Sequence, residues 1–223
     1  MPRFRALAAI LLALMTTMAT RATAQAKKPA AGVNAARKPA VPAASRDLLP
    51  FKAVEKTLPN GLKVIVVPTG FPNIVSVQIP VQTGSRNEVE PGKSGFAHFF
   101  EHMMFRGTKA YPPEKYQDIV TRSGARQNAY TTDDYTNYHT TFPKEDLETI
   151  LKIEADRFQN LSYSDSAFKT EARAVLGEYN KNSANPISKL FEVQRENAFN
   201  VHTYKHTTMG FLKDIEDLSL IHI

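Results

Sequence analysis

The chain has 223 residues, of which 42% are hydrophobic, and it contains no cysteine. This length suits one large domain, and the lack of cysteine excludes disulfides and a thiolate as metal ligand or nucleophile. The formal charge of +6 arises before residue 48, where eight Lys and Arg residues stand against one Asp. The remaining chain is nearly neutral, which argues against a nucleic-acid surface.

The first 24 residues have the pattern of a secretory signal. Arg3 and Arg5 precede a short apolar run, and the small residues Ala22–Ala24 form a cleavage site, with Ala24–Ala26 as the alternative. The run is too short to span a bilayer. We therefore expect export, to a bacterial periplasm, without a stable membrane span.

A basic segment rich in Ala and Pro follows at residues 25–47 and reads as a linker. The folded region is expected from residue 48 to 217. It opens with apolar runs at 51–58 and 62–68 around Pro59-Asn60-Gly61, a strong hairpin signal. Residues 73–84 form a third strand, in which Pro80 marks an edge or a bulge.

A polar loop then leads into an apolar helix near residues 95–105, with Ser94 as the expected N-cap. The pattern beyond it predicts a helix at 114–123 and then two strands rich in Thr and Tyr, at 126–132 and 135–142. Three further helices are expected, at 144–161, at 164–182 and after Pro186. Strands and helices without regular alternation indicate an α+β fold, with a mixed or antiparallel sheet and helices packed on it.

The apolar helix carries the motif H-x-x-E-H at His98, Glu101 and His102. Residues four apart on an α-helix project only about 40° from each other, so both imidazoles can bind one Zn²⁺. Glu101 lies on the same side, where it can act on a metal-bound water. A hydrogen-bonded core cluster is the alternative, but the apolar neighbours leave few partners for three polar side chains.

A third ligand has to come from elsewhere in the chain. Glu171 and Glu178 are seven positions apart on the helix expected at 164–182, so they share a face. The residues alone do not rank these two carboxylates, and a solvated glutamate is the ordinary alternative for each.

With these motifs the sequence resembles the pitrilysin–insulysin family of zinc metallopeptidases, which includes the mitochondrial processing peptidases. In that family the third ligand is a Glu some 76 positions after the second His, and Glu178 stands at that distance from His102. The resemblance implies that Glu171 supports the site by orienting a ligand. Phe105-Arg106-Gly107-Thr108 also matches the family, and the fold implied is that of a mitochondrial-processing-peptidase-like metallohydrolase domain.

The resemblance also covers Asn128-Ala129-Tyr130-Thr131. In the family an edge strand here pairs with extended substrate, which implies that Asn128 and Ala129 bind peptide; an ordinary sheet strand is the alternative. His202 and His206 form a second pair four apart, and we expect them to be structural or surface residues, with a second metal site as the alternative.

The implied activity is a zinc-dependent endopeptidase acting on extended peptides or unfolded segments, with Glu101 as general base. A non-catalytic family subunit that binds peptide or partners an active subunit is the alternative, and such subunits usually lack part of the His/Glu set. Family members enclose substrate with a second domain, in cis or from a partner subunit in trans.

Family-like sequence continues to Asp217. The last six residues, 218–223, read LSLIHI, which is the translation of a transposon end used in sequencing libraries. We expect these residues to be an artefact and the gene to continue, so that the fragment alone would lack its enclosing half and be inactive.

Overall fold

The computed structural model describes residues 51–219, which form two separate compact units, 51–67 and 68–219. The first unit is a β-hairpin of β1 (Val54–Thr57) and β2 (Lys63–Val66), paired antiparallel. Gly61 takes the positive φ of +87° that the Asn-Gly pair predicts for the turn. The predicted hairpin is confirmed, whereas the expected signal and linker lie outside the described residues.

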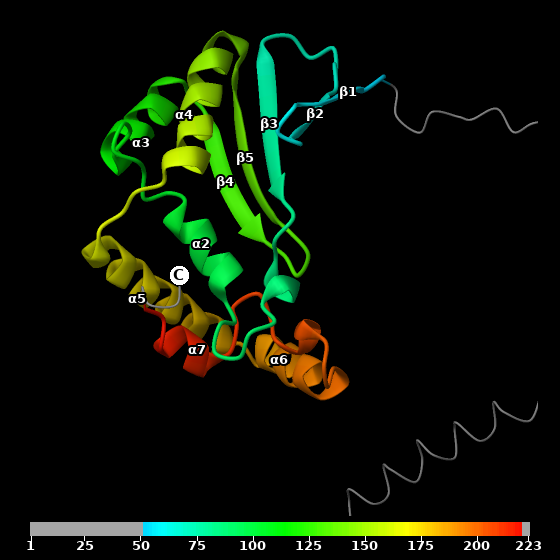
Figure 1. Cartoon of the computed structure of the whole chain (residues 1–223), viewed down its shortest axis with the longest axis vertical. Helices are drawn as coiled ribbons and strands as arrows, with labels where there is room; N and C mark the ends of the chain where they lie inside the picture. Colours follow the sequence, from blue (N-terminus) through cyan, green and yellow to red (C-terminus); the bar gives the residue numbers. More distant parts are fainter. Residues whose placement is uncertain (1–50, 220–223) are drawn as a thin grey trace, which may run out of the picture. The chain divides into compact units, whose positions relative to one another are not determined.

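The second unit contains a three-stranded antiparallel sheet (Figure 1). Its strands are β3 (Ile74–Val81), β4 (Arg126–Thr131) and β5 (Thr136–Pro143), in the order β3-β5-β4. β3 is an edge strand of this sheet, so Pro80, which lacks an amide proton, is tolerated there. The α+β class with an antiparallel sheet, predicted from the sequence, is confirmed.

Two helices pack against the sheet, α3 (Pro113–Arg122) and α4 (Leu147–Asn160). Their apolar stripes meet β5 in a buried cluster of Tyr116, Val120, Phe142, Ile150 and Ile153. Full burial of each aliphatic side chain contributes about 1.5–3 kcal/mol.

A second core joins the helix of the H-x-x-E-H motif, α2 (Phe96–Met103), to α5 (Asp165–Ser183) and α7 (Leu212–Glu216). It consists of Phe99, Met103, Phe168, Val175, Tyr179 and Ile215. The Ser164 side chain accepts a hydrogen bond from the Ala167 amide, so the N-cap expected for α5 is present. α6 (Pro186–Ala198) follows after Asn185, whose side chain caps it in the same way.

The N-cap expected at Ser94 is wrong. The capping position is Gly95, at a φ of +88°, and the Ser94 hydroxyl donates to Asp214 at 2.6 Å. Glu88 takes over the capping role, because its carboxylate accepts from the Gly95 and Ala97 amides at 2.8 Å each. Ser94 instead hydrogen-bonds Asp214, which lies 120 positions further along the chain, and the local sequence does not reveal this partner.

A smaller cluster of Met104, Ala129 and Tyr138 connects the end of α2 to the sheet. Beside it, the buried guanidinium of Arg157 pairs with Glu154 and lies 5.0 Å from the Phe105 ring centroid and 5.1 Å from that of Tyr138. The segment just after α2, α4 and β5 therefore meet around one cation.

Candidate metal centre

The two motif histidines lie side by side on α2, with ring centroids 4.8 Å apart. The adjacent face of the helix carries Phe99 and Met103, which are fully buried and fix the rotation of α2 about its axis. The apolar residues of the motif therefore determine the direction in which His98 and His102 point.

Glu178 reaches this pair from α5. Its Oε2 atom is 3.6 Å from His98 Nε2 and 3.5 Å from His102 Nε2. These distances are too long for good hydrogen bonds. They are close to the roughly 3.3 Å that separates ligand atoms around a tetrahedral Zn²⁺ with bonds of about 2.0–2.1 Å. With ligand atoms all within 4.8 Å of one another, the three side chains fit a single metal ion.

The protonation of His98 suits a metal ligand. Burial chiefly, and the neighbouring His102 in addition, outweigh the opposing effect of Glu178 and lower the pKa of His98 to about 4. The imidazole is therefore neutral at pH 7, the form that donates a lone pair to a metal.

Glu171 contacts the outer nitrogen of His102. Its Oε2 atom is 3.1 Å from His102 Nδ1, and its other oxygen forms an ion pair with Arg106. A carboxylate only accepts, so Nδ1 carries the proton and Nε2 is left with its lone pair toward Glu178. The resemblance implied this orienting contact for Glu171, whereas the residues alone left its role open.

Glu101 lies on the same helix and faces β4. The Thr131 hydroxyl donates to Glu101 Oε2 at 2.6 Å. Burial raises the pKa of Glu101, and this effect is the largest. The bond from Thr131 and the charge of His102 lower the pKa, whereas the charge of Glu178 raises it. A carboxylate with a raised pKa beside the candidate ligands is placed as a proton acceptor would be.

Asn128 and Ala129 lie in β4, which pairs with β5 and forms the other edge of the three-stranded sheet. The Ala129 amide donates to the Asn128 side chain at 2.9 Å. β4 is also in contact with α2, so this edge runs beside the candidate metal centre.

The second histidine pair stays away from this cluster. His202 Nδ1 accepts from the Tyr204 amide, and His206 is buried against Phe211. Among residues 51–219 only one group of His and acidic side chains could hold a metal, and it includes neither. Sequence reasoning missed the contacts of Glu88 and Thr131 with α2, which depend on partners from other elements.

Comparison with known proteins places these observations in a family. Residues 63–211 match the model of the insulinase family, peptidase family M16. The chain is 34% identical over 166 residues to the "Zinc protease PqqE" of Helicobacter pylori, covering 74% of this chain and 37% of that protein. It is 31% identical over 162 residues to the "Cytochrome b-c1 complex subunit 1, mitochondrial" of Rattus norvegicus, covering 73% and 33%.

A solved structure agrees with the sequence matches. A protease from Helicobacter pylori superposes with a TM-score of 0.72 at 34% identity, over 77% of this chain and 41% of that one. The chain thus spans about a third to two fifths of the length of these three proteins. The chain belongs to the insulinase family of peptidases, family M16, and is homologous to its zinc metalloproteases.

Proposed function

We propose that this chain is the zinc-binding, catalytic part of an endopeptidase that cleaves extended peptides or unfolded segments. The observation that carries the proposal is the meeting of His98, His102 and Glu178 in a geometry that fits one tetrahedral ion, with Glu101 beside it. A bound Zn²⁺ would acidify a water molecule and polarise the scissile carbonyl.

The chain's own residues would perform the remaining steps. Glu101 would accept the proton of the attacking water and deliver it to the leaving amine. Glu171, held by Arg106, would keep His102 in the tautomer that presents Nε2. The carboxylates of Glu101 and Glu171 both have partners that restrict their movement. The free energy needed to reorganise the site during the reaction is therefore smaller.

The edge of β4 would bind the substrate backbone. An extended peptide adding to this strand gains main-chain hydrogen bonds without much demand on its side chains. In the structure the Ala129 amide donates a hydrogen bond to the Asn128 side chain. For this amide to bind substrate, the Asn128 side chain would have to rotate away, and it could then hydrogen-bond the peptide itself.

We also propose that the activity needs a second family domain, in cis or from a partner subunit, and that it is exerted in a periplasm. Support comes from the greater length of the relatives and from the signal pattern of residues 1–24, which lie outside the described part of the chain. Within residues 51–219 no helix is long and apolar enough to cross a membrane.

The test is made on the full gene product and on Glu101→Gln, with zinc content and cleavage of a quenched peptide library as readouts. We expect about one zinc per chain in both proteins. The parent should show EDTA-sensitive cleavage, and the variant should lose at least about 100-fold, the usual scale of a general base. Full activity in the variant would refute the role of Glu101, and a lack of zinc in both would refute the site.

A second candidate function is a non-catalytic subunit, and one finding favours keeping it. A relative 31% identical to this chain is named as a subunit of the cytochrome b-c1 complex, not as a protease. Zinc binding without cleavage by the full gene product would support this candidate and direct the search toward a partner subunit.

A further inference from the structure

Thr131 holds the carboxylate of Glu101. The hydroxyl Oγ1 lies 2.6 Å from Glu101 Oε2, and the Thr131 backbone also hydrogen-bonds this carboxylate. An ionised carboxylate can only accept, so both Thr131 groups are donors. Bonds of this length to a charged acceptor are among the stronger ones in proteins.

The position of Thr131 is itself fixed. It is the last residue of β4 and pairs with Thr136, the first residue of β5. Thr136 is buried and donates its hydroxyl to the Thr83 carbonyl at 2.9 Å, so its proton is already used there. The Thr131 hydroxyl, 3.3 Å from that of Thr136, is left to donate to Glu101.

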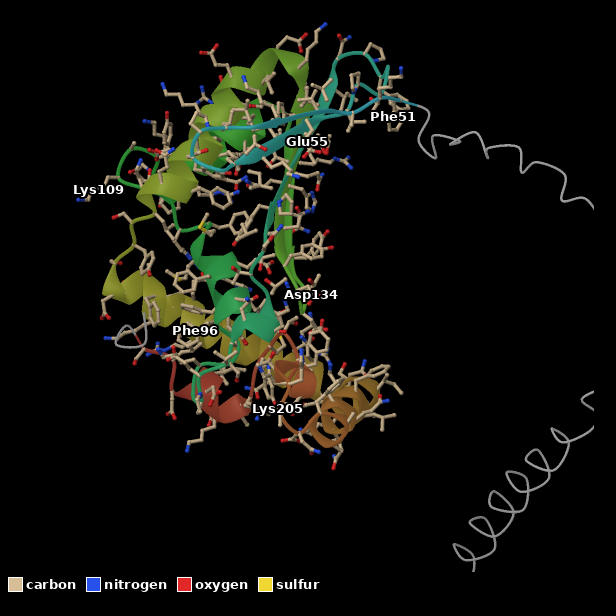
Figure 2. The ribbon with its side chains drawn as sticks, turned by 45° about the vertical axis from the view of Figure 1, so that its right-hand side comes forward. Phe51, Glu55, Phe96, Lys109, Asp134 and Lys205 are labelled. Atoms are coloured by element: carbon tan, nitrogen blue, oxygen red, sulfur yellow. The ribbon has the colours of Figure 1, made fainter. Side chains whose placement is uncertain are left out.

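The turn after Thr131 adds to this rigidity. The Thr132 amide donates to the Tyr135 carbonyl at 2.8 Å, and the Thr132 hydroxyl accepts from the Tyr135 amide at 3.1 Å. Asp134, labelled in Figure 2, lies within the same turn and accepts from the Tyr204 hydroxyl at 2.7 Å. The end of β4 is therefore anchored on both sides of Thr131.

We propose that Thr131 is a positioning residue that sets the rotamer of the general base Glu101 through the hydrogen bond between its hydroxyl and Glu101 Oε2. The proposal rests on the proposed function. The Thr131 hydroxyl holds one carboxylate oxygen, Oε2, in place. Without this bond the two sp³ torsions of the glutamate side chain can exchange among their staggered rotamers.

The position of Thr131 on β4 also relates the general base to the proposed peptide-binding edge. Thr131 belongs to the same strand as Asn128 and Ala129, the proposed peptide-binding residues. A strand that pairs with the peptide on its edge and bonds the base at its end fixes the distance between the scissile bond and the base. Orientation of this kind contributes strongly to rate, since displacements of about 1 Å can cost 100-fold.

The test uses two variants and a matched control. Thr131→Val keeps the shape and β-branching but removes the hydroxyl, whereas Thr131→Ser keeps the hydroxyl. Thr141→Val removes a hydroxyl from β5 at a site where its partner is the exposed Ser76. All three substitutions preserve residues compatible with a strand.

The first readout does not depend on activity. Side-chain scalar couplings of Glu101 are measured by NMR in the zinc-free protein. We expect one rotamer in the parent, in Thr131→Ser and in Thr141→Val, and averaged couplings in Thr131→Val. A single unchanged rotamer in Thr131→Val would overturn the proposal, whether or not the protein proves to be a peptidase.

The second readout is peptide cleavage by the full gene product. Thr131→Val should lower kcat about tenfold or more, with KM and zinc content changed less than about twofold, the loss expected for one hydrogen bond to a charged group. Thr131→Ser should recover most of kcat. Equal kcat in the parent and Thr131→Val would refute the positioning role, whereas a parent that never cleaves would refute the proposed function and leave the NMR result to decide on Thr131.

Discussion

At the scale of single residues, three side chains of the candidate centre are each held by a second group. His102 is held by Glu171, Glu171 by Arg106, and Glu101 by Thr131. Such supporting contacts restrict rotation, so that the donors are arranged before a metal or substrate arrives.

The contact between Glu171 and His102 gives a prediction on metal affinity. Glu171→Gln should weaken zinc binding about 10–100-fold, because an amide holds the His102 tautomer less firmly than a carboxylate. Competition with a chromophoric zinc chelator measures the change. Glu196→Gln, an exposed position on α6, is the control and should bind like the parent. An unchanged affinity in Glu171→Gln would show that its bond to His102 does not support the metal.

The carboxylate of Glu88 gives a prediction on pH. Burial chiefly, with the charge of Asp214, raises the pKa of Glu88 to about 7 against the opposing bonds from the Gly95 and Ala97 amides. The unfolded chain releases this proton near pH 4.5, so between pH 4.5 and 7 the folded state binds more protons. Stability from this group is therefore full below pH 4.5 and falls as the pH rises through 7.

Glu88→Gln removes this titration. The free energy of unfolding of the parent should fall relative to that of the variant by a few kcal/mol between pH 4.5 and pH 7.5. Urea unfolding at several pH values gives the difference. A gap between the two proteins that is constant with pH would mean that folding does not raise the pKa of Glu88.

At the scale of elements, the start of α2 depends on a close contact between two backbones. A Cβ built on Gly95 would lie 2.6 Å from the Met209 carbonyl oxygen, and one on Gly210 would lie 2.6 Å from the Gly95 nitrogen. The loop before α7 is thereby pressed against the first turn of the metal-motif helix.

The contribution of this contact to stability can be distinguished from that of backbone strain by comparing substitutions at two glycines. Gly95 and Gly92 have φ values of +88° and +82°, but a Cβ on Gly92 would meet no atom within 4 Å. Gly92→Ala should cost about 1–2 kcal/mol for the left-handed conformation alone. Gly95→Ala should cost clearly more, since backbone must also move. Equal losses in thermal or urea unfolding would show that the contact is dispensable.

The elements and part of the site could be predicted from the sequence. The Asn60-Gly61 turn, Ser164 and the apolar stripe of α4 act through near neighbours, and local pattern therefore located them. The residues alone also gave the His98–His102 pair, because four positions on a helix fix its geometry. The choice of Glu178 over Glu171 needed the family resemblance.

The remaining contacts depend on how distant elements pack. Ser94 is a fair N-cap by type, yet Asp214 takes its hydroxyl. Thr131 is of a residue type common in strands, so nothing in the sequence sets it apart. Its bond to Glu101 exists only because β4 lies beside α2. No period or spacing in the chain encodes these pairings.

At the scale of the whole molecule, the three candidate ligands join elements that otherwise meet through apolar packing. α2 brings the two histidines and α5 brings Glu178, and both helices belong to the same buried cluster. Binding of a metal would add a cross-link to this core, so stability and metal content should be coupled.

The coupling gives a prediction on stability. At free zinc 100-fold above its dissociation constant, the free energy of unfolding should rise by about 2.7 kcal/mol over the value in EDTA. Magnesium should have no such effect, since it prefers octahedral oxygen ligands. His98→Ala should abolish the increase. A zinc effect that persists in this variant would place the binding elsewhere.

The distance along the chain between the ligands has a consequence for how the protein is made. His102 and Glu178 are separated by 76 positions, although their side chains meet in the folded structure. At about 5–20 residues per second, a ribosome needs roughly 4–15 s to add the third donor after the second histidine. During synthesis the chain therefore passes through a stage with only two of the candidate donors, and a metal could be held by all three only after α5 has been made and packed against α2.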